Sequence, residues 1–181
     1  MPLAYFALAA VAAAAPASAP APIAGVPLPP DPVFETELTR VATERARLEL
    51  KGVLAQLEGD RSQSVQAKTE MKQKLSRLKI AVYTTPRSLD ETVAVYEKKI
   101  EKATFLFGER NLLADLLDVA RAGGFSVTPE AQKAWTGKTV RSARWGREDG
   151  AVEIDVEDHL IDPRNGQVAK KTVVLITSIG E

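Results

Sequence analysis

The sequence predicts an α+β fold, in which an antiparallel sheet of three or four strands is covered by helices and preceded by a helical pair. Apolar residues recur at three- and four-residue spacing through much of residues 32–135, and they alternate with polar residues from residue 138 onward. The first pattern buries one side of a helix, and the second buries one face of a strand. With 181 residues, 45% of them apolar, the chain can form one domain and a tail.

Residues 1–17 are expected to be a signal peptide. The run "MPLAYFALAAVAAAA" is uncharged and is shorter than the roughly 20 residues that a membrane span needs. Cleavage after Ala17 would place Ala15 and Ala17 at the two small-residue positions of the cleavage site. The segment is atypical because no Lys or Arg follows Met1 before residue 40. The alternative is an Ala/Pro-rich disordered tail.

Residues 18–31 form a Pro/Ala-rich segment that is expected to be an extended tether. A remnant without a role is an equally good interpretation. Residues 32–78 are expected to be a helical segment. Asp31 and Pro32 favour a helix start, and the apolar stripe runs to about Glu58. After "EGDRSQS" a second helix is expected to about Arg77, so the two can pair as a hairpin or present their stripe to a partner.

Residues 79–181 are expected to be an α+β domain. "KIAVYTT" is typical of a strand, and "ATFLF" is either a strand or a buried connection. Capping residues predict three helices. They are Ser88 with Glu91 for a helix over 89–101, Asn111 for one over 111–122, and Thr128 with Pro129 for one to about Trp135. The first two helices are expected to cover one face of the sheet.

The C-terminal strands are predicted to form a meander of "KTVRSARW", "AVEIDVEDHLI" and "VAKKTVVLITSI". A turn over residues 163–166 would pair Ile161 with Val168 and, further back, Val156 with Val173. In that register the buried face carries these residues: Val152, Ile154, Val156, Leu160, Val173, Leu175 and Ile179.

The opposite face of this hairpin carries the candidate catalytic residues Glu153, Asp155, Glu157 and His159. Carboxylates at alternate strand positions lie roughly 6 to 7 Å apart, a separation used for acid–base chemistry on glycosides. The simpler interpretation is a solvated strand face. No metal site is expected, because one His and no Cys cannot form the usual zinc shell.

A second candidate region combines aromatic and basic residues that could bind an anionic polymer. It contains Trp135, Lys138, Arg141, Arg144, Trp145 and Arg147, and no acid occurs over 131–146. In a strand, however, Arg141 and Arg144 face opposite ways. The simpler interpretation is that these arginines pair with the acids of the next strand.

Composition and motifs make several classes of function unexpected for this chain. The chain lacks cysteine, a P-loop, a dinucleotide fingerprint and a G-x-S-x-G elbow, so no cofactor is expected. Residues 40–181 carry 24 basic and 21 acidic residues, too small an excess to indicate nucleic-acid binding. No membrane span is expected in the mature chain.

The sequence therefore predicts an exported protein of the bacterial envelope, in the periplasm or at the cell surface. We expect a non-catalytic interaction or accessory module whose partner is another envelope protein. The alternatives are a carboxylate-dependent hydrolase acting through the acidic strand face and a binder of anionic polymer.

Overall fold

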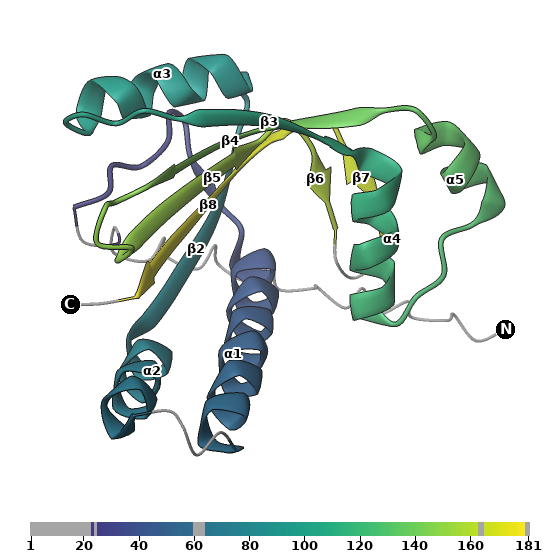
Figure 1. Ribbon diagram of the computed structural model, residues 1–181. Coiled ribbons are helices and arrows are strands. Elements are labelled where there is room, and N and C mark those ends of the chain that lie inside the picture. Colours follow the sequence, from purple (N-terminus) through teal and green to yellow (C-terminus); the bar gives the residue numbers. More distant parts are fainter. Residues whose placement is uncertain (1–22, 24, 60–63, 163–164, 180–181) are drawn as a thin grey trace, which may run out of the picture.

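The computed structural model describes residues 23, 25–59, 64–162 and 165–179 and has an α+β fold (Figure 1). The helices are α1 (Thr36–Gly59), α2 (Val65–Arg77), α3 (Leu89–Lys99), α4 (Leu112–Gly123) and α5 (Pro129–Trp135). The strands are β1 (Val33–Phe34), β2 (Leu78–Thr85), β3 (Leu106–Asn111), β4 (Thr139–Gly146), β5 (Val152–Glu157), β6 (Leu160–Ile161), β7 (Val168–Ala169) and β8 (Thr172–Ile179).

The predicted antiparallel sheet is present, and within the described residues it is wider than expected. Six strands pair in the order β1-β2-β8-β5-β4-β3, and β6 and β7 form a separate two-stranded sheet. All pairs are antiparallel. The two extra strands of the main sheet are β1, a two-residue strand, and β3, which begins at Leu106 within the apolar run "ATFLF".

The helices begin where capping side chains supply the first backbone N–H groups with acceptors. Ser88 and Glu91 form the expected capping box at α3. Asn111 caps α4, and Thr128 caps α5. The start of α1 differs from the prediction. Val33 and Phe34 pair with β2, and the ring of Phe34 lies 5.6 Å from that of Tyr83, so the helix begins at Thr36 rather than at Pro32.

Two helical groups lie on opposite faces of the sheet (Figure 1). On one face, α3 buries Leu89, Val93 and Tyr96 against a core that includes Ile154 and Val174. On the other face, α1 and α4 lie apart from each other, and α2 lies beside α1 (Figure 1). The expectation that the helices at 89–101 and 111–122 share one face was therefore wrong.

The N-terminal segment continues onto the α3 side of the sheet. Ile23 and Val26 are buried in the same hydrophobic core as α3. The hydroxyl of Thr85 donates a hydrogen bond to the carbonyl of Pro30 (2.7 Å), and Arg87 forms an ion pair with Asp31 (2.9 Å). The later part of the proposed tether is thus packed on the domain. Residues 1–22, which hold the proposed signal peptide, lie outside the described part of the chain.

The register of the C-terminal hairpin changes by one residue along its length. At the tip, Ile161 pairs with Val168 as expected, but Val156 pairs with Val174 instead of Val173. Between the pairs Glu157–Val173 and Leu160–Ala169, the first strand has two residues, 158 and 159, and the returning strand has three, 170–172. The extra residue on one strand is typical of a β-bulge. A one-residue shift exchanges the two faces of a strand.

The shift decides which side chains of β8 face the helices. Thr172, Val174, Ile176 and Ser178 are buried on the α3 side. Val173, Leu175 and Thr177 instead lie on the face shared with Glu153, Asp155 and Glu157. The expected burial of Val173, Leu175 and Ile179 beside Val156 was therefore wrong.

Candidate functional site

A cleft lies between α1, the second face of the sheet, and α4. Its volume is about 620 Å³, which is within the roughly 300 to 1,000 Å³ typical of ligand-binding clefts. Its apolar half is lined by Val82 and Leu175 of the sheet and by Leu38 and Val41 of α1. Its charged half is lined by groups from β3, β4, β5 and α4, and α1 adds Arg45 and Glu49, which pair with each other.

Residues of α1 line the cleft along one side of that helix. They are Leu38, Val41, Ala42, Arg45, Ala46 and Glu49. This spacing of three and four residues describes a single helical face. The start of α1 is fixed on the sheet, because the backbone N–H of Val82 donates to Thr39 Oγ1 (2.9 Å) and that of Glu35 donates to the carbonyl of Val82 (2.9 Å).

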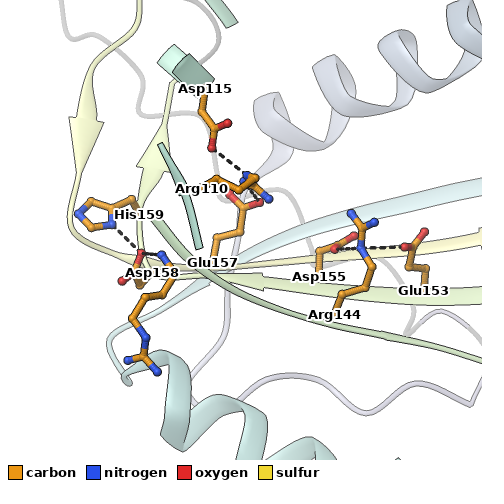
Figure 2. A network of polar contacts seen from close by, with 9 residues as sticks. Arg110, Asp115, Arg144, Glu153, Asp155, Glu157, Asp158 and His159 are labelled. Carbon is orange, nitrogen blue, oxygen red and sulfur yellow. Dashed lines mark hydrogen bonds and ion pairs between the residues drawn. The ribbon is translucent and has the colours of Figure 1, made fainter. Parts of the chain in front are cut away.

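Two arginine side chains organise the charged half of the cleft (Figure 2). Arg110 Nη2 lies 2.6 Å from Glu157 Oε1, and Arg110 Nε lies 2.9 Å from Asp115 Oδ2. Arg144 Nε lies 2.5 Å from Asp155 Oδ1 and 3.0 Å from Glu153 Oε1. Each guanidinium is therefore shared by two carboxylates, so that each set of three groups carries one net negative charge.

The ion pairs also raise the pKa values of the two arginines. Burial alone would lower the pKa of Arg110, but hydrogen bonds and attraction from Glu157 and Asp115 outweigh it, and the pKa is raised. The hydrogen bond to Asp155 is the main reason that the pKa of Arg144 is raised. Both side chains stay fully charged at any physiological pH.

His159 follows the end of β5 and lines the cleft together with Glu157. Its Nδ1 atom lies 2.6 Å from Oδ1 of Asp158, and the His159 side chain is 14% exposed. The same Asp158 oxygen accepts a hydrogen bond from the backbone N–H of Arg141 (3.0 Å). His159 and Asp158 thus join the end of β5 to β4, just before the chain enters β6 (Figure 2).

The aromatic and basic residues of the second candidate region lie in different places. Arg141 forms a bidentate pair with Asp90 of α3 (3.0 and 3.2 Å), whereas Arg144 lies in the cleft on the other face. Trp145 packs against the core on the α3 side. The remaining residues of the region make local contacts. Lys138 Nζ lies 4.4 Å above the ring of Trp135, and Arg147 pairs with Asp149 in the β4–β5 turn.

Sequence reasoning missed the groups that surround the acidic strand. Arg110 lies in "GERN" and Asp115 in α4, both distant in sequence from Glu157. No local pattern connects these residues, since only the pairing of β3 with β4 and of β4 with β5 brings Arg110 to Glu157. The pairing of Arg144 with Glu153 and Asp155 was expected from adjacent strands, and it is present.

Three further findings concern metal-binding clusters, membrane-spanning helices and similarity to known proteins. No three His, Cys, Asp or Glu side chains within them are arranged to hold a metal ion. None of the helices within them is long and apolar enough to cross a membrane. Compared with known proteins, the chain matches no family model, no curated protein and no solved structure.

Proposed function

We propose that the protein is a non-catalytic binding module of the bacterial envelope and that the cleft between α1, the sheet and α4 is the surface through which it binds. The observation that carries the proposal is the cleft itself, in which half-buried apolar side chains lie beside fixed charges. Partly exposed apolar surface that is rimmed by polar groups is typical of interaction sites.

The contacts of the carboxylates support binding over catalysis. In a glycosidase two carboxyl groups face the scissile bond, one as the general acid and the other as the base or nucleophile. Here Asp155 and Glu157 are each in contact with a guanidinium of the protein itself. The concave shape of the site is compatible with a hydrolase, but both carboxylates already have partners among the side chains of the sheet.

The arrangement of the arginines gives less support to an anionic-polymer binder. Arg141, Arg144 and Arg147 are directed to separate carboxylates, and Arg141 and Arg144 are on opposite faces of the sheet. A polyanion would have to compete with each of these ion pairs at a different surface. A protein partner that enters the cleft needs no such rearrangement.

The proposal is tested by crosslinking in the native envelope fraction, followed by mass spectrometry of the captured partner. Ala46→Trp places a large ring in the cleft, and Ala55→Trp makes the same change at an exposed position of α1 outside it. We expect the first variant to lose the crosslinked partner and the second to retain it, while both keep the circular dichroism spectrum of the parent.

Two results would contradict this proposal. One is a partner that is captured equally by both tryptophan variants, because the cleft would then not be the binding surface. The other is a glycosidase or esterase activity of the purified protein that Glu157→Gln abolishes. Recovery of the protein from the cytosol, with an intact mass that includes residues 1–17, would overturn the envelope assignment.

A further inference from the structure

The charged residues that line the cleft carry an excess of negative charge. Asp115, Asp118, Asp155 and Glu157 lie on the sheet and α4 together with two arginines, Arg110 and Arg144. Arg45 and Glu49 of α1 also line the cleft, but they form an ion pair with each other. Asp155 is the most enclosed of these groups, with its side chain 15% exposed. Charges in a half-buried site are screened less by salt than those on an open surface.

The apolar half of the cleft lies next to the charged half on the same sheet face. Ile80 and Val82 of β2 and Val173 and Leu175 of β8 form its floor, and β5 continues that floor with Asp155 and Glu157. A ligand that fits both halves must therefore combine aliphatic surface with a positive group.

The length of the cleft indicates the size of its occupant. Its α1 lining runs from Leu38 to Glu49, which corresponds to ~16 Å along a helix that rises 1.5 Å per residue. An extended peptide rises about 3.3 Å per residue, so a segment of about five residues spans this distance.

We propose that the cleft receives a short extended segment of a partner protein in which a Lys or Arg and aliphatic residues occupy alternate positions, so that their side chains share one face of the segment. The basic group lies between the two arginine–carboxylate sets and pairs with Asp155 or Glu157. The aliphatic side chains cover Val82 and Leu175. This inference rests on the proposed function, because it specifies the chemistry of the partner at the same cleft.

The test uses the full protein and the synthetic peptide acetyl-Leu-Ala-Leu-Ala-Lys-amide, in which both Leu side chains and the Lys side chain share one face when the peptide is extended. Its analogues carry Gln or Glu in place of Lys, or Ser in place of both Leu. Isothermal titration calorimetry at low ionic strength is expected to rank the Lys peptide first, with affinity at least about tenfold lower for the Glu peptide, because like charges across an interface are unfavourable. The Ser analogue is expected to bind more weakly than its parent.

Two protein variants test whether the preference for the Lys peptide comes from the carboxylates of the cleft. Asp155→Asn retains an acceptor for Arg144 but removes one negative charge, so the preference for Lys over Gln is expected to fall by about threefold or more. Asp149→Asn is the matched control, because Asp149 is an exposed carboxylate in the β4–β5 turn, where it pairs with Arg147 outside the cleft. The control is expected to retain the preference of the parent protein.

The inference is overturned if the Glu peptide binds as tightly as the Lys peptide, or if Ala46→Trp leaves the affinity for the Lys peptide unchanged. Its failure is distinguishable from failure of the proposed function. One outcome is that the protein binds the Lys, Gln and Glu peptides with equal affinity while Ala46→Trp still abolishes crosslinking to the envelope partner. In that case a basic segment is excluded as the ligand, and the cleft remains the binding surface. If the peptide ranking holds while crosslinking is unaffected by Ala46→Trp, the proposed function fails.

Discussion

Arg110 and Arg144 decide what the acidic strand face can do. An alternation of acids and valines resembles either a solvated face or a row of candidate general acids. Each arginine lies between two carboxylates and holds their oxygens at distances of 2.5 to 3.0 Å. The result is a fixed, negatively charged wall. Its charge is complementary to that of a cationic ligand.

Tyr96 is a second residue whose surroundings affect the stability of the fold, because its hydroxyl is buried. Tyr96 is 0% exposed, and its oxygen has no hydrogen-bond partner among the described residues. Burial is also the main reason that the pKa of this phenol is raised well above its usual value. An unpartnered buried polar group destabilises a folded protein, because it loses hydration without gaining a hydrogen bond.

Tyr96→Phe is therefore expected to leave the free energy of unfolding unchanged or to raise it by up to about 1 kcal/mol. The measurement is urea denaturation followed by circular dichroism. Thr92→Val is the control, because the buried hydroxyl of Thr92 donates to the carbonyl of Ser88 (2.8 Å). The free energy of unfolding of Thr92→Val is expected to fall by about 1 kcal/mol, because this hydrogen bond is lost. A loss of similar size in Tyr96→Phe would mean that its hydroxyl has a partner.

Among the elements, the C-terminal hairpin has the largest influence on the cleft. Gly166, near its tip, lies close to Leu116 of α4, and the extra residue within 170–172 turns Val173 and Leu175 toward α1. The pattern "TVVLITSI" has aliphatic residues on both faces, so alternation alone could not select the register. The turn was predictable from Asp162 and Gly166, whereas the bulge that follows it was not.

Gly166 tests the contact between the hairpin and α4. Its φ of +69° lies in the left-handed region, and a Cβ there would come within 2.6 Å of Phe125 Cε2 and 3.1 Å of Leu116 Cδ1. Gly166→Ala is therefore expected to destabilise the fold by ~2 to 4 kcal/mol, from backbone strain and overpacking together.

Gly150 provides the matched comparison. Its φ is +67°, but a Cβ at this position meets nothing within 4 Å. Gly150→Ala is expected to lower the free energy of unfolding by only about 1 kcal/mol, because the left-handed backbone conformation is unfavourable for Ala but its side chain meets no other atom. Thermal or urea unfolding of both variants measures the difference. Equal losses would show that the hairpin tip does not pack on Leu116 and Phe125.

At the level of the whole molecule, local signals predicted the elements, and long-range pairing created the site. Ser88, Asn111 and Thr128 each cap a helix as expected, because a cap depends on residues within one turn. The placement of α4 opposite α3 depends on its connection to the edge strand β3, which no short pattern encodes. The same applies to Arg110, which reaches Glu157 only across the assembled sheet.

Site-specific photocrosslinking tests the central claim most directly. A photoreactive phenylalanine analogue is introduced at Ala46, in the cleft, or at Ala55, on the exposed part of α1, and the full chain is irradiated in the native envelope. We predict that the probe at position 46 captures a partner protein through a segment with a basic residue beside aliphatic residues, and that the probe at position 55 captures none. Capture from position 55 alone would contradict the account.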